Sequence, residues 1–496
     1  MTNPAKTNGA DEARVLDAVP TGLFIGGSWR PAASGATLAV DDPATGKTLV
    51  EVADAGVEDG MEALSAACAA QQSFAAMAPR ERGEILRRAY DTIMERVDDL
   101  ALLMTMEMGK PLAESRGEVA YAAEFFRWFG EEAVRIDGGY AIAPAGTSRF
   151  MVLKQPVGVC LLITPWNFPM AMGTRKIGPA IAAGCAMVLK PAQQTPLSMH
   201  ALAEILAESG LPDGVLNIVT TSDAGGVMEP LIRDGRARKL SFTGSTPVGK
   251  KLLEQASDKV LRTSMELGGN APFLVFDDAD LDKAVDGAMQ AKMRNMGEAC
   301  TAANRFLVHR SIAPAFADRL AERMGALVVG RGTEEGVQVG PLVDAKGRDK
   351  VVTLVRDALD KGAQVRIGAD PQDGAGYFYP PTVLTDVPLQ ARLTSEEIFG
   401  PVAAITVFDD EDEAVTAAND TEFGLVSYLF TENLTRALRV SERLEAGMVG
   451  LNTGLVSNPA APFGGIKQSG LGREGGSVGI DEFLETKYVA IGYGGR

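Results

Sequence analysis

The sequence predicts an α/β fold with two domains, each built on a mainly parallel sheet. Short apolar runs alternate with amphipathic segments from residue 157 onward, and the alternation starts again near residue 273. The length of 496 residues normally divides into two or more domains. Alternation of this kind is typical of a parallel sheet with helices on both faces.

The first domain is expected to alternate strands and helices along the chain. Strands are expected at residues 157–163, 186–190, 215–219 and 239–242, and helices at residues 171–183, 196–209, 226–233 and 248–255. Gly210 and Pro212 end the second of these helices. Residues 57–76 and 82–106 also show helical spacing, so we expect them to pack on the same sheet.

A second α/β series follows, with segments outside it that have no sheet of their own. Its strands are expected at residues 273–276, 306–308 and 402–407, and its helices at residues 281–293 and 314–327. Residues 138–154 and 483–491 are half-apolar and extended, so we expect them to pair across subunits. Residues 1–20 are polar and alanine-rich, which predicts a loose N-terminal arm and not a signal peptide.

Charge and apolar patterning indicate the class of partner. The 48 basic and 65 acidic residues give a net charge of −17, which argues against nucleic acid or an anionic membrane as a partner. The longest apolar runs fall well short of the roughly 20 residues that a membrane span needs. We therefore expect a small-molecule partner and a cytoplasmic location.

Cysteine and histidine usage limits the possible chemistry. The four cysteines are scattered without a C-x-x-C spacing, which indicates a reducing compartment and argues against a thiolate metal site. The chain has two histidines, His200 and His309, so we expect no metal of the usual zinc kind. A catalytic base is more plausibly a carboxylate.

Two loops are candidates for ligand binding. At residues 242–247 a strand turns through Gly244 into a helix, whose free N–H groups suit a phosphate. The run from Gly244 nearly spells a P-loop, but Lys251 occupies the place of the magnesium-binding Ser or Thr. Residues 164–169 follow a strand at its carboxyl end, where Asn167 could serve as an oxyanion donor or belong to a rigid surface turn.

Two further motifs are residues 266–270, with Glu266 and a glycine pair, and residues 295–300, which end in Cys300. A lone cysteine is more often a small buried apolar residue than a nucleophile. Together with residues 190–192, 396–402 and 462–465, however, these motifs resemble the aldehyde dehydrogenase superfamily. The order and spacing agree from about Phe24 to Tyr488.

The resemblance implies a particular domain plan. A Rossmann-like cofactor domain would comprise residues 21–137 and 157–267, and a doubly wound catalytic domain residues 268–470. A small β oligomerisation element would comprise residues 138–156 and 471–496, after an arm at residues 1–20. The protein would be a homodimer or homotetramer.

The resemblance also implies residue roles. Cys300 would be the nucleophile, Asn167 with the Cys300 backbone N–H would stabilise the oxyanion, and Glu266 would be the general base. Glu397 would hold the nicotinamide ribose and Lys190 the adenosine ribose. The implied NAD or NADP site comprises Thr164, Pro165, Trp166, Lys190, Ala192, Gln193, Gly244, Ser245, Leu267, Glu397 and Phe399. The alternatives for Glu397 and Lys190 are a strand-end charge and a solvated lysine.

Two positions depart from the superfamily pattern. Glu298 replaces the usual glutamine two residues before the nucleophile, which predicts a more acidic neighbourhood. Gln193 is neutral where NAD-preferring members commonly have glutamate, so the choice between NAD and NADP stays open.

Within the superfamily, residues 172–176, 292–295 and 463–474 most resemble succinate-semialdehyde dehydrogenases. This implies that Arg175 and Arg294 bind a substrate carboxylate, with help from Ser457. The implied substrate site comprises Arg175, Arg294, Ser457, Phe168 and Phe463. The alternatives are intraprotein salt bridges for both arginines, glutarate semialdehyde or a broader aldehyde set as substrate, and a catalytically silent NAD-binding protein.

Overall fold

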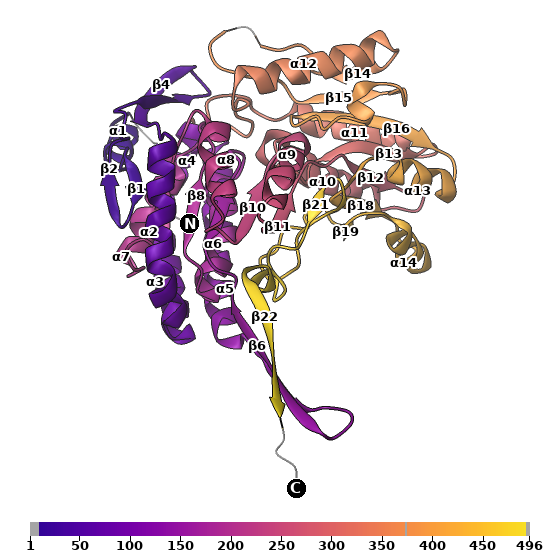
Figure 1. Ribbon diagram of the computed structural model, residues 1–496. Helices are drawn as coiled ribbons and strands as arrows, with labels where there is room; N and C mark the ends of the chain where they lie inside the picture. The colour runs from indigo at the N-terminus through magenta and orange to yellow at the C-terminus, as the bar shows by residue number, and fades with distance from the viewer. Residues whose placement is uncertain (1–8, 373, 493–496) are drawn as a thin grey trace.

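The computed structural model describes residues 9–372 and 374–492 and contains two α/β domains (Figure 1). The first domain holds an eight-stranded sheet in the order β2-β1-β9-β8-β7-β10-β11-β21. Its parallel strands are β7 (Cys160–Ile163), β8 (Met187–Lys190), β9 (Leu216–Ile218), β10 (Lys239–Thr243) and β11 (Arg262–Glu266). The strand order reverses between β7 and β10, which is the doubly wound pattern predicted for this domain.

Helices cover both faces of this sheet. They are α2 (Val57–Ala76), α3 (Pro79–Glu95), α4 (Val97–Met108), α5 (Leu112–Glu132), α6 (Pro169–Ala183), α7 (Leu197–Glu208), α8 (Ala224–Asp234) and α9 (Thr246–Ser257). The single helix expected at residues 82–106 is wrong, because the chain bends at Arg96 between α3 and α4. The apolar spacing continues through the bend, so the sequence pattern did not reveal it.

The second domain contains a seven-stranded sheet in the order β14-β15-β16-β13-β12-β18-β19. The strands are β12 (Ala271–Val275), β13 (Ala303–His309), β14 (Gln364–Ile367), β15 (Thr382–Thr385), β16 (Val402–Phe408), β18 (Val426–Phe430) and β19 (Met448–Leu451). All of its pairings are parallel except that of β14 with β15. The helices are α10 (Leu281–Met293), α11 (Ala313–Gly325), α12 (Ala345–Asp360), α13 (Glu411–Asn419) and α14 (Leu434–Arg443).

The segments that belong to neither α/β series form a third, three-stranded sheet. Strand β6 (Ser148–Pro156) pairs antiparallel with β5 (Gly139–Ile142) on one side and with β22 (Leu484–Gly492) on the other. The two segments therefore pair with each other within one chain, and pairing across subunits stays a prediction. The sheet projects from the body of the protein as an arm (Figure 1).

The C-terminal part of the chain reaches the first domain before it enters this arm. Strand β21 (Gly470–Leu471) pairs antiparallel with β11 at the edge of the first sheet. We expected the oligomerisation element to begin at residue 471. In the structure, the C-terminal strand that joins the arm begins at Leu484. Residues 493–496, also assigned to that element, lie outside the described residues.

The N-terminal segment differs from the loose arm that we expected. Residues 1–8 lie outside the described residues, but α1 (Gly9–Asp17) is a helix with Val15 buried against the first domain. Two strands, β1 (Leu23–Ile25) and β2 (Ser28–Arg30), then extend the first sheet, and β3 (Thr37–Asp42) pairs with β4 (Lys47–Ala53). In the part of the chain that the structure describes, every helix is too short or too polar to cross a bilayer.

Candidate active site

A cavity of about 470 Å³ lies between the two domains and is the candidate active site. From the first sheet it receives the loops at the carboxyl ends of β7 and β10, as expected for a doubly wound sheet. From the second sheet it receives segments at the amino ends of β13 and β16. The rule that ligands bind at the carboxyl ends of parallel strands therefore predicts only the part of the site that the first domain contributes.

Most of the expected site residues meet at this cavity. Those that line it are Pro165, Trp166, Asn167, Phe168, Arg175, Gly244, Ser245, Glu266, Leu267, Arg294, Cys300, Glu397, Phe399, Ser457 and Phe463. Thr164, Lys190, Ala192 and Gln193 do not line it. Lys190 and Ala192 are buried beside the carboxyl end of β8, whereas Gln193 is exposed.

A turn with unusual backbone geometry presents Cys300. Asn295 and Met296 both have positive φ angles, of 53° and 54°, and Gly297 follows with 78°. Side-chain-bearing residues rarely adopt this region, so surrounding contacts must hold the turn. A Cβ on Gly297 would lie 2.2 Å from the Gly400 carbonyl oxygen, so only glycine fits this close approach. Cys300 follows in a partly exposed position at the cavity.

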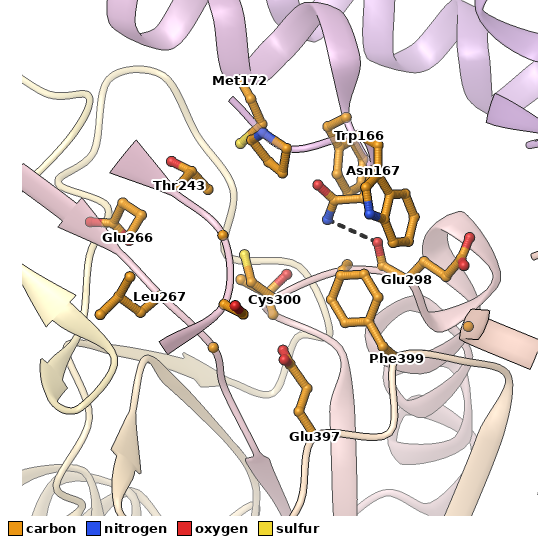
Figure 2. A pocket seen from close by; sticks show the side chains of 18 of the residues that line it. Trp166, Asn167, Met172, Thr243, Glu266, Leu267, Glu298, Cys300, Glu397 and Phe399 are labelled. Carbon is orange, nitrogen blue, oxygen red and sulfur yellow. Dashed lines mark hydrogen bonds between the residues drawn. The ribbon is translucent and has the colours of Figure 1, made fainter. Parts of the chain in front are cut away.

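Asn167 is locked against this turn. Its carbonyl oxygen accepts hydrogen bonds from Lys110 Nζ at 2.8 Å and from Asn295 Nδ2 at 2.9 Å. Its own Nδ2 donates to the Glu298 carbonyl oxygen at 3.0 Å (Figure 2). The amide is thus fixed beside Cys300, and among the described residues its Nδ2 makes this one hydrogen bond.

The support for Asn167 extends into the first domain. Lys110 forms a buried ion pair with Glu118 of α5, and both side chains are 1% exposed. The Glu118 carboxylate also accepts hydrogen bonds from the backbone N–H groups of Met170 and Ala171, at 3.1 and 3.2 Å. A carboxylate at the start of α6 is favoured by the helix dipole. The sequence analysis missed Lys110 because no motif marks it.

Glu266 ends β11 and lines the same cavity as Cys300, without a polar partner among the described residues. The side chain is 3% exposed, and among the described residues neither carboxylate oxygen makes a hydrogen bond. Burial raises the pKa of Glu266 well above its usual range, and nearby Glu474 raises it further, while Arg175 and Lys176 oppose the rise. An unpartnered carboxyl group with a raised pKa suits a general base.

The thiol of Cys300 is protonated in this environment at neutral pH. Burial raises the pKa of Cys300 to about 12. The positive charge of Arg175 opposes this rise, whereas Glu266 and Glu397 add to it. A thiolate therefore has to be formed during the reaction, because the thiolate is the nucleophilic form.

Glu298 does not make the neighbourhood of the thiol more acidic, which corrects the expectation from the sequence. Its carboxyl group points away from Cys300 (Figure 2), and its Oε1 accepts a hydrogen bond from the Val343 N–H at 3.2 Å. Burial raises the pKa of Glu298 well above its usual range. The backbone carbonyl of this residue, not its carboxyl group, contacts the site.

Two arginines with aromatic support form one wall of the cavity. Arg294 Nη1 donates to Ser457 Oγ at 2.9 Å, and the guanidinium lies 4.8 Å from the Phe168 ring centroid. The Arg175 guanidinium lies 4.1 Å from the Phe463 ring centroid. The expected cluster of two guanidinium groups and one hydroxyl group therefore gathers on one side of the cavity.

Arg175 also makes the intraprotein contacts that were the alternative interpretation. Its Nη1 lies 3.5 Å from Glu474 Oε2, and its Nη2 donates to the Tyr121 hydroxyl oxygen at 2.8 Å. Tyr121 lies 5.6 Å from the Arg294 guanidinium as well. The sequence did not indicate Tyr121, since only the packing of α5 brings it to the cavity.

The opposite side of the cavity has the features of a nucleotide site. The hydroxyl groups of Thr164 and Thr243, after β7 and at the end of β10, are buried without a hydrogen-bond partner in the described residues. Helix α9 begins after Ser245, whose side chain does not cap it, so its first N–H groups are free for a phosphate. These observations fit a dinucleotide cofactor.

Glu397 lies near this side in a strained segment. Its Oε1 accepts a hydrogen bond from the Gly269 N–H at 3.2 Å, and burial raises its pKa to about 7. Phe399 has a φ angle of 58° and packs edge-on against Trp166 at 5.3 Å between ring centroids. Further lining residues that the sequence did not indicate come from the start of α12, namely Asp344, Lys346, Gly347 and Lys350.

Comparison with known proteins places this architecture in a family. The sequence model described as the aldehyde dehydrogenase family matches residues 29–489. The chain belongs to the aldehyde dehydrogenase family. The superfamily resemblance seen in the sequence is thereby confirmed, and so is the α/β fold with a Rossmann-like domain and a catalytic domain.

Several relatives of this aldehyde dehydrogenase are named for acidic aldehydes. A succinate-semialdehyde dehydrogenase of Paenarthrobacter nicotinovorans is 60% identical over 89% of this chain and 98% of that protein. A glutarate-semialdehyde dehydrogenase of Pseudomonas aeruginosa is 50% identical over 95% of this chain and 97% of that protein.

Solved structures agree closely with the fold. The crystal structure of an NADP-dependent enzyme of Escherichia coli aligns with a TM-score of 0.95 and 49% identity, covering 97% of this chain and 99% of that chain. The NAD⁺ complex of an aldehyde dehydrogenase from Bacillus cereus has a TM-score of 0.94 and 35% identity, covering 98% of this chain and 99% of that chain.

Proposed function

We propose that this aldehyde dehydrogenase oxidises succinate semialdehyde to succinate with NAD or NADP. The observation that carries the proposal is the pair of guanidinium groups, Arg175 and Arg294, with Ser457 on the wall of the cavity that contains Cys300. A substrate carboxylate removed from bulk water must be paired, and guanidinium groups do this well. The names of the relatives support the same substrate class.

The proposed chemistry begins at Cys300. The thiol proton passes to water, the Sγ attacks the aldehyde carbon, and the Asn167 amide with the Cys300 backbone N–H stabilises the oxygen that becomes negative. A bound nicotinamide supplies the acceptor for the hydride. Glu266 then takes a proton from the water that attacks the resulting thioester, and the Cys300 sulfur leaves with the bonding electron pair as the acid forms.

The proposed cofactor site extends from the cavity to the carboxyl end of β8 in the first sheet. Trp166, Gly244, Ser245 and Glu397 line the cavity, and the free N–H groups at the start of α9 suit the pyrophosphate. Lys190 and Gln193, outside the cavity, would contact the adenosine ribose. Relatives named for NADP and an NAD⁺ complex are both similar to this chain, so either cofactor is consistent with the comparisons.

A second candidate substrate is glutarate semialdehyde, which is one methylene longer. Two relatives of 50% and 51% identity, from Pseudomonas aeruginosa and Pseudomonas putida, carry that name. One methylene changes binding by only about 1–3 kcal/mol, so the same arginine pair would accept both acids.

The proposed domain division and assembly follow the domain plan that the superfamily resemblance implies. We assign residues 21–137 and 157–267 to cofactor binding and residues 268–470 to catalysis. The projecting arm exposes apolar side chains, with Tyr140 64% and Tyr488 66% exposed. Covering this arm with a second copy would bury them, which supports a homo-oligomer. A cytoplasmic location remains part of the proposal.

The deciding experiment compares succinate semialdehyde with butanal, which has the same chain length without the carboxylate. Reduced cofactor is followed at 340 nm. Arg294→Leu should cost succinate semialdehyde about 2–5 kcal/mol in kcat/KM and leave butanal nearly unchanged. Arg87→Leu, at an exposed arginine on α3, is the matched control. Equal losses for both substrates, or a wild type that prefers butanal, would refute the substrate class.

A further inference from the structure

Arg175 lies between the proposed acid-binding wall and a buried carboxylate outside it. Its guanidinium lines the cavity, and its Nη1 is 3.5 Å from Glu474 Oε2. The side chain is 2% exposed, and its Nε has no hydrogen-bond partner among the described residues. The group thus keeps an unused donor, although it already contacts a carboxylate.

Glu474 is held firmly by a second cation. Lys176 Nζ donates to Glu474 Oε1 at 2.6 Å and to Ser241 Oγ at 2.9 Å. The backbone of Glu474 pairs with Phe463 in both directions, at 2.7 and 2.8 Å. The carboxylate therefore cannot follow Arg175 if the guanidinium turns toward a ligand.

The pKa of Glu266 depends directly on these charges. The charged groups that face it are Glu474, Arg175, Lys176 and Arg473. Arg473 is engaged with the backbone carbonyl groups of Gly465 and Gly472. Among these groups, Arg175 is the one that both lines the acid-binding wall and contacts Glu474.

We propose that Arg175 is a positioning residue that couples recognition of the substrate's acid group to the general base Glu266, through its contact with Glu474. This inference rests on the proposed function, because it requires an acid group beside Arg175. A carboxylate at the cavity wall competes with Glu474 for the same guanidinium. With Arg175 so engaged, the surroundings of Glu266 become more negative, and Glu266 holds a proton more strongly.

The proton affinity of Glu266 should therefore depend on which acyl group is bound to Cys300. A succinyl thioester carries a carboxylate beside Arg175, whereas a butyryl thioester does not. The hydrolysis of the succinyl enzyme should therefore depend on a stronger base. Arg175 also contacts Tyr121, Phe125 and Phe463, and these residues are identical in the two acyl enzymes.

The test measures hydrolysis of the two acyl enzymes directly. Wild-type holoenzyme is mixed with labelled succinate semialdehyde or labelled butanal and quenched at intervals, and the decay of label on the protein is followed from pH 5 to 9. The acidic limb for the succinyl enzyme should have a midpoint higher by roughly half a pH unit or more. Coincident midpoints, with succinate semialdehyde still preferred in kcat/KM, would overturn the coupling alone.

A variant pair identifies the route of the coupling. Glu474→Gln should remove the difference between the two midpoints while the preference for succinate semialdehyde in kcat/KM remains. Glu485→Gln, at an exposed carboxylate of the same segment, should keep the difference. A difference that survives Glu474→Gln would overturn the role of Glu474. A wild type without preference for succinate semialdehyde would instead overturn the proposed function, and the coupling with it.

Discussion

The side-chain amide of Asn167 donates a hydrogen bond of 3.0 Å to the carbonyl oxygen of Glu298, two residues before Cys300. This bond joins the loop after β7 in the first domain to the turn before β13 in the second. The proposed oxyanion donor and nucleophile therefore keep their relative position only while the domains stay docked. Small displacements of such groups cost large factors in rate.

Glu266→Gln should separate the two halves of the proposed reaction. Attack by Cys300 and hydride transfer do not require a base for water, so one equivalent of reduced cofactor should appear rapidly. The following steady state should be slow, because the thioester then lacks its general base. Stopped-flow absorbance at 340 nm measures both phases. If burst and steady state decline together, Glu266 is not the base for hydrolysis.

The reactivity of the Cys300 thiol should increase with pH without levelling off near neutrality. Its pKa is raised to about 12, so the thiolate fraction grows about tenfold per pH unit between pH 6 and 10. Alkylation by iodoacetamide, followed by peptide mass spectrometry, reports this fraction, and Cys300→Ala shows which label belongs to the residue.

Arg175→Leu should slow this alkylation at every pH, because it removes the largest positive influence on the thiol. A plateau near pH 8 in the wild type would contradict the high pKa. Faster labelling of the Arg175 variant would contradict the role of its charge.

Lys110→Met should destabilise the protein through the partner that it leaves behind. Lys110 and Glu118 are both 1% exposed, and an unpaired buried carboxylate costs about 3–5 kcal/mol. Urea unfolding measures the loss, and adding Glu118→Gln should restore part of it. Arg116→Met is the matched control, since Arg116 and Asp98 form an exposed pair worth about 0–1 kcal/mol. A loss no larger than that of the control would show that the pair is not needed.

Gln193→Glu should shift the cofactor preference toward NAD. A carboxylate facing the adenosine ribose would repel a 2′-phosphate, and we expect a change of about tenfold in the ratio of kcat/KM for the two cofactors. Gln193→Ala separates the loss of the amide from the gain of charge. Because Gln193 is exposed and lies outside the cavity, an unchanged ratio would place it away from the ribose.

Periodicity in the sequence was sufficient for most of the fold. The helices at residues 57–76 and 281–293 have the predicted limits, since their spacing is clear and their ends carry turn signals. The bend at Arg96 was missed because apolar spacing continues through it. Strand β21 could not be predicted either, since two residues carry no periodic pattern.

The candidate site was predictable where its residues lie in continuous motifs. Cys300, Glu266 and Asn167 belong to such motifs, and all three line one cavity. Lys110 and Tyr121 reach the site only through the packing of the helical layer, so no local pattern marks them. The direction of the Glu298 carboxyl group was also inaccessible, because it depends on a hydrogen bond to Val343 far along the chain.

The pairing of β21 with β11 determines when the enzyme becomes complete during synthesis. Leu471 covers the edge of a strand that ends at Glu266, and Phe463 and Glu474 lie in the same late segment. The ribosome must therefore produce the whole second domain before this edge is closed. Until residue 474 has emerged, the nascent chain carries an open strand edge and lacks part of its cavity wall, and open strand edges favour aggregation.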